Sequence, residues 1–310
     1  MDGPPLPNDL TGRPASEDDL PQVLELVRAS DTADVGSTDY SAADLDDDWR
    51  TAVGANGAAW VVVGKKGVVG FATAAVRSGQ RVDALGWVAP DQRGRGAGSW
   101  LAARAEELAR ERLDLPDGPL IFHWIHHPVE DAQALLRARG YEHIRSSYRM
   151  SIALDQAPVD APLPDDVTVR SVEPTEDLRP VYEAAESAFA DHWGHVIRTF
   201  EEWREQRTGS SYFDPSLWLL AESEGRIVAV SLCSIDEGDG WVDTLGVVPE
   251  RRREGLGRAM LLRGFDALRG RGLVTARLNV DAENVSGATR LYEAAGMHVD
   301  RQYDAMAKRL

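Results

Sequence analysis

Cysteine is nearly absent from this 310-residue sequence, in which Cys233 is the single example. One cysteine excludes a disulfide within the chain, and its position in the apolar run 227–235 predicts a buried strand thiol rather than a nucleophile. No apolar run approaches the roughly 18 residues of a membrane span, and the first residues do not resemble a signal peptide. We therefore expect a soluble, cytoplasmic protein without a membrane partner.

Positive charge is also scarce. The chain has 34 Lys and Arg against 51 Asp and Glu, which gives a formal net charge of −17. Such a surface repels polyanions, so nucleic acid and anionic membranes are poor partners. The basic residues are nearly all arginine, whose planar guanidinium suits bidentate contacts with phosphate. We therefore expect a few arginines at one place on an otherwise acidic surface to bind a phosphate-bearing ligand.

The most informative stretch runs from Val242 to Leu262. A β-branched apolar run ends at Pro249, and a helix with one apolar face follows. Between them lies Arg252-x-x-Gly255-x-Gly257, whose glycines let the backbone pass close to a ligand. The first helical turn leaves several amide N–H groups unpaired, and the helix dipole adds partial positive charge. This turn therefore predicts a phosphate-binding site.

The spacing lacks the Gly-Lys-Ser/Thr of a P-loop and does not match the dinucleotide pattern G-x-G-x-x-G. It resembles the pyrophosphate loop of the GNAT superfamily of N-acetyltransferases, Arg/Gln-x-x-Gly-x-Gly/Ala after a β-strand, which holds acetyl-coenzyme A. A glycine-rich turn without a ligand is the alternative. The resemblance implies cofactor contacts from Leu245, Val247, Val248, Arg252, Arg253, Glu254, Gly255, Leu256, Gly257 and Arg258.

The stretch has a counterpart earlier in the chain. Val82-Asp83-Ala84-Leu85-Gly86 matches Val242-Asp243-Thr244-Leu245-Gly246, and a second loop reads Arg93-Gly94-Arg95-Gly96-Ala97-Gly98. The residues of this second loop are further candidate contacts for the cofactor. This internal repeat predicts an α/β (α+β mixed sheet) fold built as two tandem GNAT-like domains. We expect an N-terminal domain at 11–153, a proline-rich linker at 154–165 and a C-terminal domain at 166–310.

Apolar periodicity and turn residues predict the elements of both copies. Expected helices lie at residues 17–30, 44–48, 99–112, 175–190, 199–207, 256–265 and 281–297. Expected strands lie at 58–63, 68–77, 82–88, 167–172, 217–223, 227–235, 241–248 and 274–280.

Two further features strengthen the resemblance: Asn284, which follows a strand, and the helix Leu291-Tyr292-x-x-x-Gly296. From the family, Asn284 contacts the cofactor, and Tyr292 looks like the general acid that protonates the departing thiolate of coenzyme A. A phenol with a pKa of about 10 stays protonated at neutral pH. A packing role for Tyr292 is the alternative. The first copy has Leu136 at this place, so we expect the N-terminal domain to be catalytically inactive, whether or not it binds cofactor.

Asp243 is the candidate general base, on the strand before the loop, where related enzymes place a carboxylate. Asp83 occupies the same place in the first copy, so a structural role shared by both copies is equally open. His192, Trp193 and His195 lie in the segment that lines the acceptor pocket in the family, or they end a surface helix. His123, His126 and His127 cluster in sequence, but a zinc site needs further ligands, and we expect no metal.

These features predict transfer of acetyl from acetyl-coenzyme A to a primary amine of a small molecule, by direct attack in a ternary complex at the C-terminal domain. The backbone N–H near Val247 and Val248 would polarise the thioester carbonyl, as in the family. Among tandem members the chain resembles mycothiol synthase and its relatives, through Phe213-Asp214-Pro215 and the segment 279–284. The alternatives are an acyl-coenzyme A sensor or scaffold without turnover, and mycothiol synthase proper. Acceptor identity and the choice between monomer and homodimer stay open.

Overall fold

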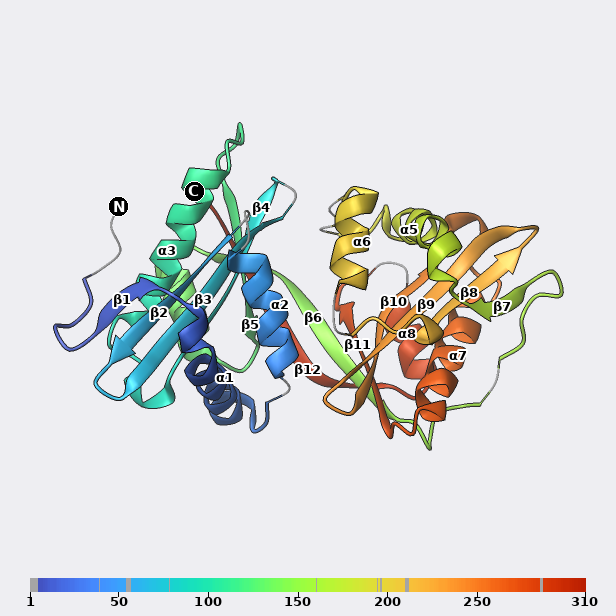
Figure 1. Ribbon diagram of the computed structural model, residues 1–310, viewed down its shortest axis with the longest axis horizontal. Coiled ribbons are helices and arrows are strands. Elements are labelled where there is room, and N and C mark those ends of the chain that lie inside the picture. Colours follow the sequence, from blue (N-terminus) through green and yellow to red (C-terminus); the bar gives the residue numbers. More distant parts are fainter. Residues whose placement is uncertain are drawn as a thin grey trace. The chain divides into compact units, whose positions relative to one another are not determined.

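The computed structural model describes residues 5–38, 40–53, 57–77, 79–159, 161–193, 195, 197–209, 212–284 and 287–310. The chain forms two compact units (Figure 1). The first unit comprises residues 1–146 and 303–310, and the second comprises residues 147–302. The α/β class with two similar units, expected from the internal repeat, is confirmed.

The first unit is a sheet with the strand order β1-β2-β3-β4-β5-β12. Neighbouring strands are antiparallel except for the parallel pair β4 and β5. Its elements are β1 (Thr11–Pro14), η1 (Glu17–Asp19), α1 (Leu20–Val35), α2 (Ala42–Val53), β2 (Gly57–Gly64), β3 (Gly67–Arg77), β4 (Arg81–Val88), η2 (Pro90–Gln92), α3 (Ala97–Arg112), β5 (Leu120–His126), α4 (Glu130–Ala138) and the last residues of β12 (His298–Arg309).

The second unit repeats this plan with the order β6-β11-β10-β9-β8-β7, in which β10 and β11 are the parallel pair. Its elements are the end of β6 (Glu142–Ala153), β7 (Thr168–Ser171), α5 (Pro174–Phe189), α6 (Phe200–Thr208), η3 (Pro215–Leu217), β8 (Trp218–Ser223), β9 (Arg226–Asp236), β10 (Asp239–Val247), η4 (Pro249–Arg251), α7 (Leu256–Gly270), β11 (Thr275–Asp281), α8 (Ala288–Ala294) and the start of β12.

In each unit, helices cover both faces of the sheet. Helices α1 and α2 pack on one face of the first sheet through a cluster that contains Val27, Trp49 and Phe71, and α3 packs on the other face. In the second unit, α5 and α6 cover one face through Val181 and Trp203, and α7 covers the other. Alternating strand residues therefore supply both cores of each unit.

The helix expected at 281–297 is shorter than the sequence pattern suggested. Residues 281–284 end strand β11 and form a turn, and α8 covers only Ala288–Ala294. Residues 285 and 286 lie outside the described part of the chain. Asp281 pairs with Ser147 in the sheet, so tertiary pairing overrides the helical pattern at this end.

The compact units do not follow the expected boundaries 11–153 and 166–310 at two strands. Residues 147–153 of β6 pair with β11 in the second unit, whereas residues 303–309 of β12 pair with β5 in the first unit. Each copy therefore completes its sheet with a strand segment from the other half of the sequence. Local sequence does not carry this information, because the two segments belong to strands of the same length with similar burial patterns.

The described residues of the expected linker contain no helix or strand, yet they pack on the second unit. Leu154, Ala157 and Ala161 are buried in its core. Arg269 donates hydrogen bonds to the carbonyl oxygens of Leu154 and Ala157, and Arg263 donates to that of Ala161. This segment is therefore a docked strap and not a free spacer.

The strand exchange predicts where core mutations act. Met306 and Met150 are both fully buried, Met306 in the first unit's core and Met150 in the second's. We expect Met306→Ala to cost about 2–5 kcal/mol and to lower amide hydrogen-exchange protection in residues of the first unit. Met150→Ala is the matched control and should lower protection in the second unit. Loss of protection in the half of the sequence that contains each mutation would contradict the exchange.

Candidate active site

In the second unit the parallel strands β10 and β11 pair only at their beginnings. Gly240 and Trp241 of β10 lie beside Ala276 and Arg277 of β11, and the later residues of β11 pair only with β6. Every residue of these strands lies in the described ranges. Beyond Trp241, the edge of β10 that faces β11 therefore has backbone groups that are not used by the sheet.

The alternation of hydrogen bonds along β10 decides which amides face this opening. The amide of Val248 donates to the carbonyl of Val228 on β9, at 3.0 Å. It is therefore not available to a ligand, which corrects the expectation that Val248 polarises a carbonyl. Because successive residues of a strand point their N–H groups to opposite edges, the amide of Val247 points toward the opening.

The turn after β10 contains a glycine that begins helix α7. Gly255 is the N-cap of α7 with φ +85°, in the left-handed region, and no side chain caps the helix. The first intrahelical bond runs from the Ala259 amide to the Gly255 carbonyl, so the amides of the preceding helical residues lack helical partners. A Cβ on Gly255 would meet no atom of the described chain within 4 Å, so the space beside it is open to a ligand.

The next glycine of the motif has a different role from the one expected. A Cβ on Gly257 would lie 3.2 Å from Leu291 and 3.7 Å from Val247. Its counterpart Gly98 faces Leu135 and Val88 in the same way. In both copies this glycine allows α7 or α3 to pack closely against the sheet and the following short helix. The side chain of Leu256 is likewise buried, which leaves only its backbone for a ligand.

The arginines of the second loop differ in what they contact. Arg252 donates to the carbonyls of Val247 and Ala188, at 3.3 and 3.0 Å. Arg251 pairs with Glu254 and Asp166. Arg253 has φ +69°, and neither it nor Arg258 has a hydrogen-bond or ion-pair partner within the described ranges. A non-glycine residue in this conformation is strained, which is common at ligand-binding sites.

In the first copy, carboxylates neutralise the loop arginines. Arg93 makes a bidentate pair with Asp34 at 2.6 and 2.9 Å. Arg95 pairs with Asp9 at 2.7 and 2.8 Å. The residue at the place of Arg253 is Gly94. The first loop therefore carries less unpaired positive charge than the second loop, although both share the helix N-terminus.

The first unit contains a cavity of about 520 Å³ at its loop. Gly94, Gly96 and Gly98 line it together with the end of β4, the end of β5 and α4. Such a volume is typical of a small-molecule site. Trp87 lines the cavity, whereas Trp100 packs over Gly12 of β1. Neither tryptophan closes it.

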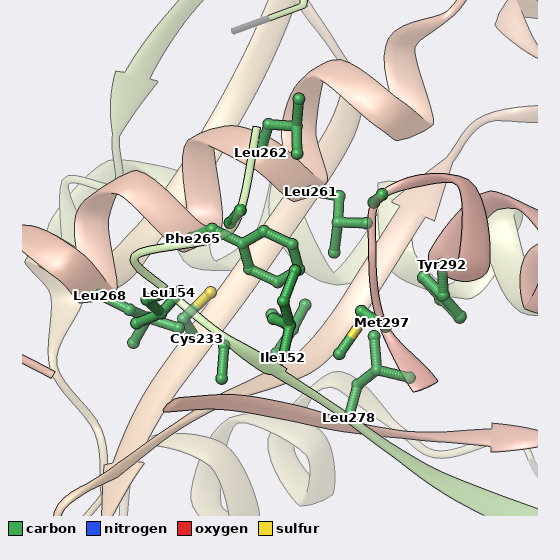
Figure 2. Close-up of a cluster of buried hydrophobic side chains, with 14 of the residues drawn as sticks. Ile152, Leu154, Cys233, Leu261, Leu262, Phe265, Leu268, Leu278, Tyr292 and Met297 are labelled. Carbon is green, nitrogen blue, oxygen red and sulfur yellow. The ribbon is translucent and has the colours of Figure 1, made fainter. Parts of the chain in front are cut away.

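Tyr292 lies on α8 at one side of the second unit's core cluster, and Cys233 lies in the opposite half of the view, near Leu154 (Figure 2). Burial raises the pKa of Tyr292 to about 12. The ring is packed, but the hydroxyl is not among the enclosed polar atoms and makes no hydrogen bond to the described residues. Burial raises the pKa of the Cys233 thiol to about 12 as well, so this thiol is a poor nucleophile.

Asp243 and Asp83 share a sequence position but not an environment. The pairing of β10 with β9 shifts register between Val242 and Thr244, which makes Asp243 a bulge residue. Its exposed carboxyl accepts a hydrogen bond from Ser234. Asp83 lies in a regular ladder and forms ion pairs with Arg77 and Arg81, at 3.3 and 2.8 Å. Bulges re-aim side chains and are frequent beside active sites, and the two aspartates therefore lie in different surroundings.

The surroundings of Asp243 act on its pKa in opposite directions. Nearby protein atoms desolvate the carboxyl and raise its pKa, while Ser234 and the positive charge of Arg207 lower it. The net direction is upward. Because the side chain stays open to solvent, screening keeps this effect modest. Arg207, on α6, was not expected in the site. Its position four residues after the buried Trp203 could have indicated that its side chain lies on the same, inward face of the helix.

The expected acceptor segment contacts the loop after β11. His192 Nε2 lies 3.0 Å from Asn284 Nδ2. His195 pairs with Glu186 at 2.9 Å, and Trp193 is exposed. The structure therefore brings His192 and Asn284 together, while His195 is held against α5.

The three histidines of the first unit do not converge. His123 is buried, which lowers its pKa to about 4, whereas His126 lies 3.7 Å from Asp31 and His127 lies 2.8 Å from Asp304. In the described part of the chain, no group of His, Cys, Asp or Glu is arranged to hold a metal ion. None of the described helices is long and apolar enough to cross a membrane.

Two α/β units, each with a splayed parallel strand pair beside a glycine-capped helix, define a class of acyltransferases that use acyl-coenzyme A. The model of the acetyltransferase (GNAT) family matches residues 20–141 and 178–297, and the chain belongs to this family. It is a tandem GNAT acetyltransferase, as the sequence motifs indicated.

Curated relatives and solved structures agree. The mycothiol acetyltransferase of Thermomonospora curvata is 36% identical over 211 residues, which cover 67% of this chain and 68% of that protein. That of Cellulomonas flavigena is 33% identical over 252 residues, or 77% of this chain and 71% of that protein. A GCN5-related N-acetyltransferase from Sphaerobacter thermophilus has a TM-score of 0.85 at 33% identity and covers 98% of this chain and 97% of its own. A tandem GNAT protein from the clavulanic acid biosynthesis pathway shares the fold, with a TM-score of 0.76 at 19% identity over 97% of this chain and 98% of its own.

Proposed function

We propose that the second unit transfers the acetyl group of acetyl-coenzyme A to a primary amine of a small molecule, by direct attack in a ternary complex. The bulge at Asp243 carries this proposal, because it takes a carboxylate out of the regular ladder, in the unit that holds Tyr292 and the less neutralised loop. The relatives are named mycothiol acetyltransferases, so the amine precursor of mycothiol is the first acceptor to test.

The residues of the second loop fit the pyrophosphate of coenzyme A. The open space at Gly255 and the unpaired amides of the first turn of α7 suit phosphate oxygens. Arg253 and Arg258 add positive charge without a competing carboxylate among the described residues. When bound, acetyl-coenzyme A supplies the activated acetyl thioester, and the Val247 amide donates a hydrogen bond to its carbonyl oxygen.

Two side chains of the second unit move protons in this proposal. An ammonium acceptor must lose a proton before it attacks, and Asp243 takes that proton. The hydroxyl of Tyr292 gives a proton to the departing sulfur, since its raised pKa keeps it protonated at neutral pH. His192 and Trp193 border the acceptor side, where Asn284 fixes the orientation of His192.

The first unit is proposed to bind acyl-coenzyme A without turnover. Leu136 replaces the acid, and Asp83 is held in ion pairs within a regular ladder. The cavity at Gly94–Gly98 is nevertheless open. A binding or sensing role is therefore the second candidate function, and it is restricted to this unit.

Removal of the hydroxyl oxygen of Tyr292 tests its proposed role as the general acid. We expect Tyr292→Phe to lower kcat by about 10² or more, because the ring keeps its packing and only the proton donor is lost. Release of coenzyme A on mixing with an amine panel measures turnover, and calorimetry should show unchanged affinity for acetyl-coenzyme A. Near-native turnover of the variant would show that Tyr292 only packs in the core. No turnover of the wild type with any amine would favour the alternative function, an acyl-coenzyme A sensor.

The pH dependence of the rate tests the proposed role of Asp243 as the general base. Since the pKa of Asp243 is raised, its ionised fraction, and with it the rate, should fall as the pH drops through a value above the ordinary carboxyl value of about 3.9. Above that value, the wild type can deprotonate an ammonium below the pKa of the amine. In Asp243→Asn, kcat/KM should instead follow the fraction of free amine. Asp83→Asn is the matched control, and equal profiles for wild type and Asp243→Asn would exclude Asp243 as the base.

Glycine substitutions test the two loops separately. Gly96 and Gly255 both have positive φ and open space at the Cβ position, so alanine costs about 1–2 kcal/mol of backbone strain without a clash in the protein. We expect calorimetry to detect two acetyl-coenzyme A molecules per wild-type chain. Gly96→Ala should weaken one binding event and preserve most activity, whereas Gly255→Ala should weaken the other together with activity. A single wild-type site that is abolished by Gly255→Ala would leave the first unit as a scaffold.

A further inference from the structure

The two copies correspond in space one residue away from the match read in the sequence. In each copy the first arginine of the loop donates through Nε to the carbonyl near the end of the preceding strand, that of Val88 in the first copy and that of Val247 in the second. A Cβ on the last glycine of each loop would also meet the valine of its own copy, at 3.7 Å. Val88 and Val247 are therefore equivalent, and two residues earlier Gly86 lies at the place of Leu245.

Helices α3 and α7 differ in the same direction. Each begins at an N-cap glycine, and counting from these caps places Ala102 of α3 where α7 has Leu261. Leu245 and Leu261 both pack in the core of the second unit, whereas Gly86 and Ala102 both line the cavity of the first unit. The first copy therefore has small residues on the cavity wall at two places where the second copy has leucine.

The lining of the cavity is mostly apolar away from the glycine loop. Apolar lining residues include Ala72, Leu85, Leu101, Ile125, Leu135 and Leu136. His123 also lines the cavity, and among the described residues the parallel pairing of β4 and β5 ends at Ala84 and His123. Burial lowers the pKa of His123 to about 4, so the imidazole is neutral at pH 7. These walls favour an apolar group over a charged one.

We propose that the first unit binds an acyl-coenzyme A with a medium-length saturated acyl chain, which occupies the space that Gly86 and Ala102 leave. This inference rests on the proposed function, which gives the first unit a coenzyme A site at its glycine loop. The cavity of about 520 Å³ is continuous with that loop, because Gly94, Gly96 and Gly98 line it as well. An apolar cavity is costly to the fold, and an acyl chain offsets this cost by removing both its own surface and the cavity wall from water.

Calorimetry with acetyl-, butyryl- and octanoyl-coenzyme A tests the proposal on the full chain. Each CH₂ group that becomes buried should tighten binding about three- to fourfold. At the site that Gly96→Ala weakens, the Kd of octanoyl-coenzyme A should therefore be about tenfold or more below that of acetyl-coenzyme A. The site that Gly255→Ala weakens should show no such gain. Octanoate alone should bind far more weakly than octanoyl-coenzyme A, and equal affinity of the two would assign the cavity to a free fatty acid and overturn the proposal.

Gly86→Leu places the side chain of the second copy in the cavity. The φ of Gly86 lies outside the left-handed region, and within the described part of the chain a Cβ there would meet only Ala72 Cβ and the Phe71 carbonyl oxygen, each at 3.6 Å. We expect this variant to abolish the gain of octanoyl- over acetyl-coenzyme A at the first site. The affinity for acetyl-coenzyme A should change little, because the second unit carries a leucine at this place. Gly86→Ala is the matched control and should keep most of the gain.

Ala102→Leu fills the cavity from the helix and should have the same effect, which covers the case of a poorly folded Gly86→Leu protein. Equal affinities of the first site for acetyl- and octanoyl-coenzyme A would overturn the inference, as would a gain that survives both leucine variants. Either result leaves the proposed turnover in the second unit standing. Absence of any coenzyme A binding that responds to Gly96→Ala would overturn the proposed binding role of the first unit, and this inference with it.

Discussion

The organisation of the second unit depends on backbone donors that the fold leaves unpaired. Strands β10 and β11 separate after two residue pairs, and α7 begins at a glycine without a side-chain cap. Unpaired backbone N–H groups are costly when buried, so such a site is stable only where water or a ligand can reach it. The left-handed Gly255 and the close packing at Gly257 are the two conditions that hold these donors in place.

The two glycine loops have similar backbones but differ in the charges that surround them. Because the chain has a net charge of −17, a phosphate-binding site needs arginines that are not neutralised by carboxylates. The first loop pairs Arg93 with Asp34 and Arg95 with Asp9, whereas Arg253 and Arg258 have no such partner among the described residues. Screening weakens the exposed Arg95 pair more than the partly buried Arg93 pair, so Asp34 is the stronger determinant of the difference.

Much of this architecture was predictable from the sequence, because the repeat, the glycine spacing and the capping signals are local. The glycine loops, the tandem units and most strands were anticipated on that basis. The strand exchange of β6 and β12 was not, since two strands of equal length and pattern can pair with either sheet. Nor could Asp243 be told from Asp83: the bulge arises from register against β9, and the partners of Asp83 are arginines on β3 and β4. Arg207 was missed because a polar residue after a buried tryptophan usually indicates only the solvent side of a helix.

The two copies differ more in particular side chains than in backbone features. Both copies keep the features that the fold supplies through the backbone, namely the splayed strands and the glycine-capped helix. Only the second has the features that depend on particular side chains: the bulged aspartate, the phenol of Tyr292 and the guanidinium of Arg207. Backbone-made sites persist under substitution as long as the glycines remain, whereas a proton donor or acceptor is lost by a single change. The open cavity at Gly94–Gly98, beside a leucine where the second copy has Tyr292, supports the proposal that the first unit binds acyl-coenzyme A without turnover.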